Sequence, residues 1–255
     1  MNADSPTPTV LDGQIALVTG ASRGIGRAIA LGLAQAGAHV IATARTQGAL
    51  EALDDDIRAA CGASATLVPL DLADGDGIDR LGGAVHQRFA RLDILVSAAG
   101  LLGATTPVAH LDPKVWDQVM AANLTANYRL IRSMDPLLRA SEAGTAIFLT
   151  SGAATSPRAF WGAYAATKAG LNALAAVYAD EVEHTSVRVA VVNPGPMRTR
   201  MRAQAFPGED PMTLPDPAEI GPLILELLDR TRPPSPGVIS FPDWKAAARV
   251  TRKPG

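Results

Sequence analysis

The chain has 255 residues, 47% of them hydrophobic and 19% charged, with a formal net charge of −2 at pH 7. This length suits one large α/β domain or two small ones. The near-neutral charge, without any block of like charges, argues against nucleic acid as the main partner, and no apolar run approaches the length of a membrane span. Cys61 is the only cysteine and excludes an internal disulfide, which fits a cytoplasmic protein. The four histidines lack metal-ligand spacing, so we expect no metal site.

Residues 1–10 have neither a basic start nor an apolar run. We therefore expect a disordered lead-in rather than a signal peptide. No composition shift, repeat or low-complexity segment divides the rest, so residues 11–255 are predicted to form a single domain.

A glycine-rich turn lies between a short apolar run, 14–18, and a helical pattern that ends near residue 37. Strand, glycine turn and helix form the context of a dinucleotide-binding motif, because the backbone can approach a pyrophosphate and the helix N-terminus attracts its charge. The spacing is Gly-x-x-x-Gly-x-Gly rather than the commoner Gly-x-Gly-x-x-Gly. Glycines also serve tight strand–helix packing, but the flanking elements favour the cofactor interpretation. The candidate contacts are Gly20, Ser22, Arg23, Gly24, Ile25 and Gly26.

The second predicted strand, 39–44, is followed directly by Arg45. An acidic residue near this place binds the ribose hydroxyls of NAD, whereas an arginine accommodates the 2′-phosphate of NADP. Arg45 together with Arg23 could hold that phosphate between two guanidinium groups. Either arginine alone could equally be a solvated surface residue. The pair favours NADP(H), with NAD(H) as the alternative.

Helices predicted over 47–60 and 78–89 alternate with strands predicted over 65–70 and 93–97. This alternation is typical of a doubly wound parallel sheet of the Rossmann type, for which we expect about seven strands. Ligands bind such sheets at the carboxyl ends of the strands. Asp71 follows the third strand and could either accept a hydrogen bond from the adenine amino group or cap the next turn.

A long helical pattern over 115–140 begins after Asp112-Pro113 and contains Asn123 in an otherwise small or apolar stretch. The simplest role for Asn123 is that of a hydrogen-bonded buried amide. A strand over 146–150, a helix over 163–184 and a strand over 187–193 are predicted to follow.

Tyr164 and Lys168 lie four residues apart within the predicted helix 163–184, which places both side chains on one face. A free phenol ionises near pH ~10, and a nearby ammonium favours the phenolate and brings its pKa toward the range useful for proton transfer. Ser151 follows a strand, where its hydroxyl could hold a carbonyl oxygen beside the phenol. The spacing alone is a weak signal, because an interfacial tyrosine and a solvated lysine give the same pattern.

Residues 196–217 contain five prolines and predict an irregular loop of the kind that covers a substrate. Asp216-Pro217 predicts a further helix, and Pro222 predicts that it is kinked or starts late. A last strand is expected over 237–241, and 243–255 show no clear pattern. Candidate lining residues for a substrate pocket, each of which could also be ordinary packing, are Leu101, Leu102, Phe160, Trp161, Met197, Met201 and Phe206. Three loop arginines could attract an acidic group, although at least two of them are expected to be solvated: Arg198, Arg200 and Arg202.

Together these residues resemble the short-chain dehydrogenase/reductase family from about residue 11 to residue 241. The matching segments are 19–26, Asp71-Leu72, Ala99-Gly100, Asn123, Ser151, 164–168 and 193–195. Residues 100–103, 161–164 and 201–211 are similar to a bacterial, NADP-preferring subgroup of oxidoreductases whose substrate is unknown.

The resemblance implies a role for each catalytic candidate. Tyr164 would be the general acid/base, Lys168 would lower its pKa and bind the nicotinamide ribose, and Ser151 would hydrogen-bond the substrate oxygen. Asn123 would link Lys168 to solvent through its backbone and a bound water. The implied cofactor contacts outside the glycine turn are Arg45, Asp71, Leu72, Ala99, Gly100, Tyr164, Lys168, Pro194, Gly195 and Thr199.

One departure from the family pattern concerns the end of the fourth strand, where Ser97-Ala98 replaces the usual Asn-Asn. In the family those asparagine amides brace the sheet and the edge of the cofactor. The replacement leaves open which groups make these hydrogen bonds here.

The predicted function is hydride transfer between NADP(H) and a small ketone, aldehyde or alcohol. A non-catalytic NADP-binding regulator or scaffold on the same fold is the alternative. An isomerase or lyase with tightly held cofactor is a third candidate. Small residues on the helices over 115–140 and 163–184, with the resemblance, imply a homodimer or homotetramer.

Overall fold

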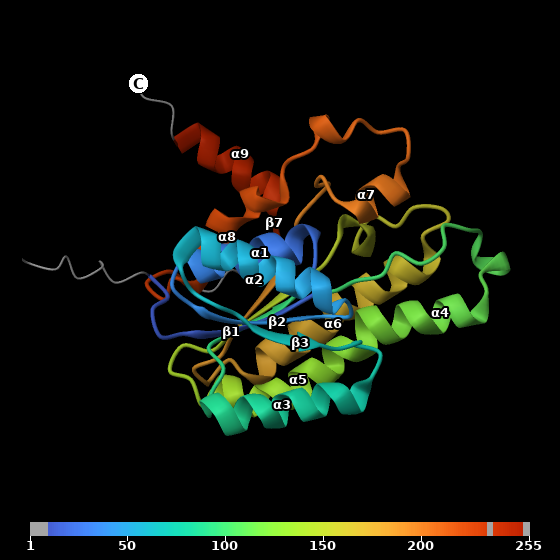
Figure 1. Ribbon diagram of the computed structural model, residues 1–255. Coiled ribbons are helices and arrows are strands. Elements are labelled where there is room, and N and C mark those ends of the chain that lie inside the picture. Colours follow the sequence, from blue (N-terminus) through green and yellow to red (C-terminus); the bar gives the residue numbers. More distant parts are fainter. Residues whose placement is uncertain (1–9, 234–236, 252–255) are drawn as a thin grey trace, which may run out of the picture.

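The computed structural model describes residues 10–233 and 237–251, so nearly all of the predicted lead-in 1–10 lies outside the described residues. Its centre is a seven-stranded sheet in the order β3-β2-β1-β4-β5-β6-β7, in which every pair of neighbours is parallel (Figure 1). The order reverses between β1 and β4, which confirms the predicted doubly wound sheet. The strands are β1 (Ile15–Thr19), β2 (His39–Ala44), β3 (Thr66–Pro69), β4 (Ile94–Ser97), β5 (Thr145–Leu149), β6 (Arg188–Asn193) and β7 (Val238–Ser240).

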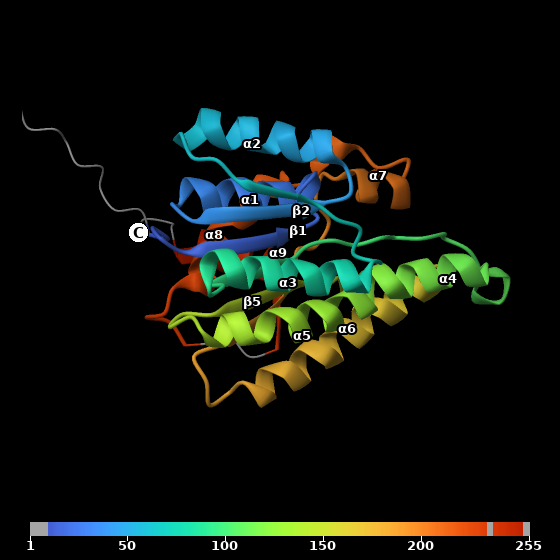
Figure 2. The same cartoon turned by 60° about the horizontal axis from the view of Figure 1, so that its bottom comes forward.

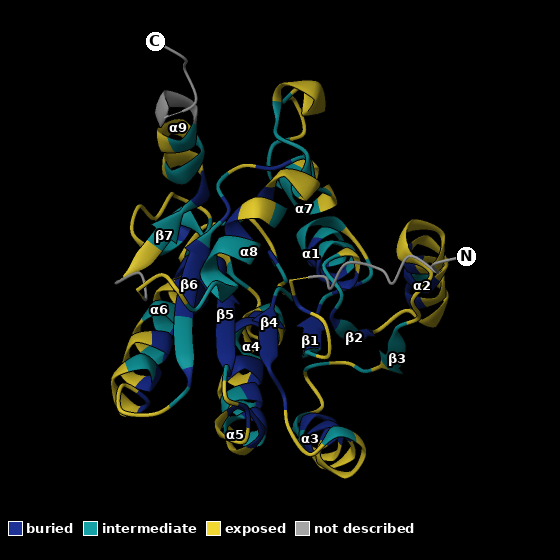
Figure 3. Cartoon of the chain, turned by 90° about the vertical axis from the view of Figure 1, so that its left-hand side faces the viewer, coloured by how far each residue is buried: buried dark blue, intermediate teal, exposed yellow. Residues whose placement is uncertain are grey.

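Helices cover both faces of the sheet, as Figures 2 and 3 show. On one face lie α1 (Gly24–Gln35), α2 (Gln47–Cys61) and α8 (Gly221–Leu228); on the other lie α3 (Gly75–Phe89), α5 (Ala126–Arg139) and α6 (Gly162–Glu181). Successive strand residues point to opposite faces. Val18 and Val96 therefore pack against α1 and its neighbours, whereas Leu17 and Leu95 pack against α3 and α5. Burial on both faces explains the continuous apolar runs of the strands.

The helix predicted over 115–140 is not a continuous α-helix. It consists of α4 (Pro113–Met120), a π-helical turn (Ala121–Thr125) and α5. The Ala126 amide donates to the carbonyl of Ala121, five residues back. The prediction of uninterrupted helix was wrong here because tertiary contacts of Asn123, described below, lie within the widened turn. Such turns occur often at functional sites.

The C-terminal third contains more helix than the sequence pattern predicted. The loop 196–217 includes α7 (Arg200–Ala205), whose N-cap Thr199 accepts a hydrogen bond from the Arg202 amide. The supposedly patternless tail forms α9 (Phe241–Thr251), which is anchored by the buried Phe241. The predicted late start of the helix after Asp216 is confirmed, because a capped 3-10 turn (Pro217–Ile220) precedes α8.

Within residues 10–233 and 237–251, no helix combines the length and the apolar character that crossing a membrane requires.

Candidate active site

The glycine turn and the end of β4 meet where the strand order reverses. Gly20 has a φ of +66°, and a Cβ at this position would lie 2.8 Å from the Cα of Ala99. A side chain cannot be placed there without moving backbone. The two predicted cofactor segments, 20–26 and 99–100, therefore face each other at the carboxyl edge of the sheet, where ligands of doubly wound sheets bind.

The start of α1 has the properties of an anion-binding site. Its N-cap, Arg23, makes no capping hydrogen bond, and its first turn contains no acidic residue. A Cβ on Gly26 would lie 2.4 Å from the Gly20 carbonyl oxygen, so the helix begins in close contact with the turn. Gly24 faces Thr199 across this edge, because a Cβ added at Gly24 would lie 3.3 Å from the Thr199 methyl group. The residues present fit the pyrophosphate of a dinucleotide, since the first amides of a helix lack intrahelical partners and the helix dipole favours negative charge there.

The two residues predicted for the adenosine end of the cofactor lie together. A guanidinium nitrogen of Arg45, after β2, is 4.0 Å from a carboxylate oxygen of Asp71, after β3. Both side chains are more than half exposed, so this ion pair is accessible to a competing anion. Arg23 is also exposed, at the neighbouring end of β1. Leu72 follows Asp71 in the same connection.

The end of β4 is braced without the usual asparagines. The hydroxyl of Thr19 accepts hydrogen bonds from the backbone amides of Ala98 and Ala99, at 3.1 and 3.2 Å. Thr19 and Ser97 are both buried. The backbone after Ser97 is therefore held by a side chain from the adjacent strand β1.

Ser151 and Tyr164 are joined by a hydrogen bond. The serine follows β5, where its hydroxyl accepts from the Ala153 amide at 3.2 Å and is hydrogen-bonded to the phenol of Tyr164 in the first turn of α6. The phenol is 8% exposed. Burial raises the pKa of Tyr164 above its ordinary value, and the Ser151 hydrogen bond opposes that rise.

Lys168 lies one turn further along α6 and is buried. Its ammonium donates to the carbonyl of Leu149 at 2.8 Å and lies 5.8 Å from the centre of the Tyr164 ring. Burial lowers the pKa of Lys168 to about 8. In the structure, burial has the largest effect on the pKa of Tyr164 and raises it.

Asn123 connects the π turn to the end of β4 and to α6. Its side chain accepts from the Leu101 amide at 2.7 Å and donates to the Leu101 carbonyl at 2.8 Å and to the Thr167 hydroxyl at 3.1 Å. A Cβ on Gly100 would lie 3.8 Å from both Asn123 Oδ1 and Lys168 Nζ. The four predicted catalytic residues thus surround one corner of the carboxyl edge, with Gly100 among them.

Apolar residues from three segments pack beside Tyr164. Leu102 and Met201 belong to the same cluster as the phenol, and Trp161 meets it edge-on with ring centres 5.8 Å apart. Phe206 lies 5.7 Å from Trp161. These four predicted pocket residues therefore lie together beside the phenol.

The other three pocket candidates differ. Met197 is 2% exposed and packs in the same core cluster as residues of α1, which is the ordinary-packing alternative. Phe160 is exposed and has an unusual φ of +72°. Non-glycine residues rarely adopt such φ values, and they concentrate near functional sites. Leu101 contacts Asn123 through its backbone amide and carbonyl.

Two of the three loop arginines are ion-paired rather than solvated. Arg198 binds Asp216 at 2.5 Å, and Arg202 binds both carboxylate oxygens of Glu209 at 2.5 and 2.6 Å. The Arg202 guanidinium also lies 3.7 Å from the centre of the Phe206 ring. These contacts fold the loop onto itself, whereas Arg200 is exposed.

The connection after β6 completes the carboxyl edge. Pro194 and Gly195 follow Asn193, whose side chain accepts from the Gly195 amide at 3.0 Å. Thr199, four residues further, reaches Gly24. Within the described ranges, no group of three histidine, cysteine or carboxylate side chains is arranged to hold a metal ion.

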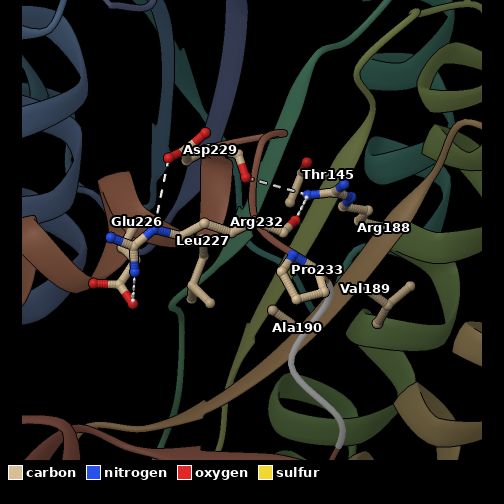
Figure 4. Close-up of a pocket in the computed structure, with 9 residues that line it drawn as sticks. All are labelled: Thr145, Arg188, Val189, Ala190, Glu226, Leu227, Asp229, Arg232 and Pro233. Atoms are coloured by element: carbon tan, nitrogen blue, oxygen red, sulfur yellow. Dashed lines mark hydrogen bonds and ion pairs between the residues drawn. The ribbon is translucent and has the colours of Figure 1, made fainter.

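A cavity of about 280 Å³ lies at the opposite edge of the sheet, bounded by Thr145 and Arg188 at the starts of β5 and β6 (Figure 4). Arg188 donates to the backbone carbonyls of Asp229 and Arg232, at 3.2 and 2.9 Å. Arg232 in turn pairs with Glu226 at 2.7 Å. The arginines shown there are used to fix the end of α8, so this cavity is a structural joint remote from Ser151.

Comparison with known proteins agrees with this geometry. The short chain dehydrogenase family matches residues 14–210. Oxidoreductase YciK of Escherichia coli is 40% identical, covering 88% of this chain and 89% of its own, and the E. coli 3-oxoacyl-[acyl-carrier-protein] reductase FabG is 35% identical over 74% and 76%. The crystal structure of a short chain dehydrogenase from E. coli CFT073, complexed with NADPH, superimposes with a TM-score of 0.87 at 39% identity, covering 92% of this chain and 99% of that one. The protein therefore belongs to the short-chain dehydrogenase family of oxidoreductases.

Proposed function

We propose that the protein reversibly reduces a ketone or aldehyde to an alcohol with NADP(H). The observation that carries this proposal is the hydrogen bond between Ser151 and the buried phenol of Tyr164, beside the buried ammonium of Lys168. A regulator that only binds a nucleotide has no need of this arrangement. When bound, the cofactor supplies the hydride, and the protein's own residues supply orientation and the proton.

The proton chemistry follows from burial. Because burial raises the pKa of Tyr164, the phenol keeps its proton at neutral pH and can act as the acid toward a carbonyl oxygen. Ser151 holds that oxygen beside the phenol and so fixes the substrate's orientation. A protonated phenol suits the reducing direction, which agrees with the printed name of the E. coli relative FabG as a reductase.

The carboxyl edge supplies the cofactor contacts. The amides of the glycine turn 20–26 would hold the pyrophosphate, Arg45 with Arg23 the 2′-phosphate, and Lys168 the nicotinamide ribose. NADP(H) is therefore the preferred cofactor. Related chains from E. coli CFT073 and Shigella flexneri were crystallised with NADPH and NADP, which supports the preference.

The test is NADPH oxidation against a panel of carbonyl compounds, which includes aliphatic and aromatic ketones, aldehydes and a 3-oxoacyl thioester. The apolar wall of Trp161, Met201 and Phe206 favours the less polar members. Tyr164→Phe should bind NADPH with unchanged affinity and lose roughly 10²-fold or more of kcat. Tyr128→Phe, at an exposed tyrosine of α5, is the control and should retain full activity. Equal activity of the two variants would refute the assignment of Tyr164.

We also propose that the protein forms a homodimer or homotetramer through the outer faces of α5 and α6. Tyr128 on α5 and Val177 on α6 are 50% and 56% exposed. Exposed aromatic and aliphatic side chains on adjacent helices are typical of a subunit interface. Light scattering of the purified chain distinguishes a monomer, dimer and tetramer.

A further inference from the structure

Asn127 is a buried polar residue of α5 that the predicted site did not include. It is 2% exposed, and its side-chain amide donates to the backbone carbonyl of Asn123 at 2.7 Å. This bond fixes the orientation of the amide group, since the reverse orientation would place two oxygens against each other. The remaining side-chain oxygen, Oδ1, is buried and accepts no hydrogen bond from any residue within 10–233 and 237–251.

The position of this oxygen follows from the packing of α5 on α6. Both helices follow strands of a parallel sheet, so they run in the same direction. Asn123 contacts Thr167, and Leu124 packs on Gly170. A Cβ added at Gly170 would lie 3.0 Å from the Leu124 side chain. Asn127, one turn further along, is therefore level with the turn of α6 that begins at Lys168.

The ammonium of Lys168 has hydrogen-bond donors to spare. It carries three N–H groups, and within the described residues only the Leu149 carbonyl accepts from it. The proposed ribose contact takes a second donor and leaves a third. The Lys168 ammonium thus has a spare donor, and Asn127 Oδ1 lacks one. A single buried water could accept a hydrogen bond from the ammonium and donate one to Oδ1.

We propose that Asn127 is a positioning residue of the proton supply to the active site. It fixes the Asn123 carbonyl and presents Oδ1 to a water held by Lys168. The inference rests on the proposed function, in which each reduction removes one proton from Tyr164 and one proton from solvent must replace it. The water and Lys168 carry that proton inward, and no other reactant is needed.

The residue type supports this role over simple packing. An aliphatic side chain of similar size would fill the same space without leaving an acceptor unpaired, and a serine or threonine could satisfy the Asn123 carbonyl by itself. A buried, unpaired acceptor lowers stability. Asparagine is the side chain that both donates to this carbonyl and keeps a second acceptor for the water.

Asn127→Leu removes both hydrogen bonds at nearly constant volume. We expect kcat for reduction to fall about tenfold or more, less than the loss of a direct acid or base. The Kd of NADPH should change less than about threefold, which is about 0.7 kcal/mol, and the solvent deuterium isotope effect on kcat should increase. Asn127→Ser keeps a hydroxyl and room for a second water, so its kcat should lie between those of Asn127→Leu and the native protein.

Tyr178→Phe is the matched control for disturbed packing. Tyr178 is buried between the same two helices and donates to Asp135 at 2.9 Å, ten residues beyond Lys168. This variant should lose stability, yet it should leave kcat and the isotope effect unchanged.

Three results would overturn the inference. The first is an Asn127→Leu protein with native kcat and isotope effect, the second is a weakening of NADPH binding in proportion to kcat, and the third is an equal effect of Tyr178→Phe. Failure of the native protein to oxidise NADPH with any carbonyl would overturn the proposed function together with this inference, and so differs from failure of the inference alone.

Discussion

The ammonium nitrogen of Lys168 lies 5.8 Å from the centre of the Tyr164 ring, one helical turn along α6, while its hydrogen bond is made to the main chain of β5. The two groups are buried together, and burial moves their pKa values in opposite directions, upward for the phenol and downward for the ammonium. Burial disfavours the charged form of each. The phenol is therefore protonated at neutral pH, and the charge that changes first as pH rises is that of Lys168.

This order of titration predicts the pH dependence of reduction. With a pKa of about 8 in the free protein, Lys168 loses its charge and a donor proton at higher pH. We expect kcat/KM for NADPH to be constant below pH 8 and to fall at most tenfold per pH unit above it, because kcat/KM reports groups of the free enzyme. Steady-state rates from pH 6 to 10 measure the profile.

Lys168→Arg separates charge from geometry. A guanidinium stays protonated throughout this range, so the variant should have a lower plateau but no fall near pH 8. A fall that persists unchanged in Lys168→Arg would assign the titration to another group.

Burial of Lys168 also predicts a pH-dependent stability. The folded-state pKa of about 8 lies below the ordinary 10.5, so between these values the unfolded chain binds a proton that the folded chain has released. Stability therefore rises with pH across this window, by up to about 3 kcal/mol for the full shift. Urea denaturation gives the free energy of unfolding of the native protein and of Lys168→Met at pH 7.5 and at pH 10. The effect is the change, between the two pH values, in the difference between these two free energies. A difference that is the same at both pH values would show that the pKa is not depressed.

The sequence predicted the sheet well because its signals are local. Each strand is a short apolar run, and β2, for example, has the predicted bounds 39–44. The π turn around Asn123 was not predictable, since it depends on bonds from this side chain to Leu101 and Thr167, which are distant in sequence. Helix α9 was missed because its anchor, Phe241, is identified only by its burial.

The active site shows the same division. The place of Ser151 directly after a strand predicts its hydroxyl beside the phenol of Tyr164, and the structure brings the two residues together. The direction of the phenol's pKa shift depends on desolvation, which no spacing reveals. Nothing in the sequence marks Asn127 as part of the site except its place four residues after Asn123, a spacing that favours one helix face for both. The sequence leaves open whether Met197 lines a pocket or packs in the core, because an apolar residue in a loop gives no sign of which side it packs on; the structure places it in the core.

Two alanine substitutions on α1 test the anion-binding turn. At Gly26 a Cβ would lie 2.4 Å from the Gly20 carbonyl oxygen, so Gly26→Ala must displace the turn and should weaken NADPH binding about tenfold or more, a loss of about 1.4 kcal/mol. At Gly32, within the same helix, a Cβ meets nothing within 4 Å. Gly32→Ala should keep NADPH binding and stabilise the protein by about 0.5–1 kcal/mol, because alanine has the higher helix propensity. Fluorescence titration and thermal unfolding measure both effects, and similar behaviour of the two variants would contradict the proposed contact.

Cofactor preference should depend on Arg45. A charge-assisted hydrogen bond contributes about 1.5–3 kcal/mol, so Arg45→Leu should raise the KM of NADPH about 10- to 150-fold. The KM of NADH, which lacks the phosphate, should change little. Arg80→Leu removes another exposed, ion-paired arginine, on α3, and should alter neither constant.

Asp71 provides the complementary test, since its carboxylate is 4.0 Å from Arg45 and competes with a phosphate for the same guanidinium. Asp71→Asn removes that competition and the negative charge, so the ratio of kcat/KM for NADPH to that for NADH should rise. Loss of a contact to adenine would lower both values equally and leave their ratio unchanged.

The Arg45 and Asp71 variants test the same contact from its two sides. If Arg45→Leu changed the KM of NADPH and the KM of NADH by the same factor, recognition of the 2′-phosphate at this position would be excluded.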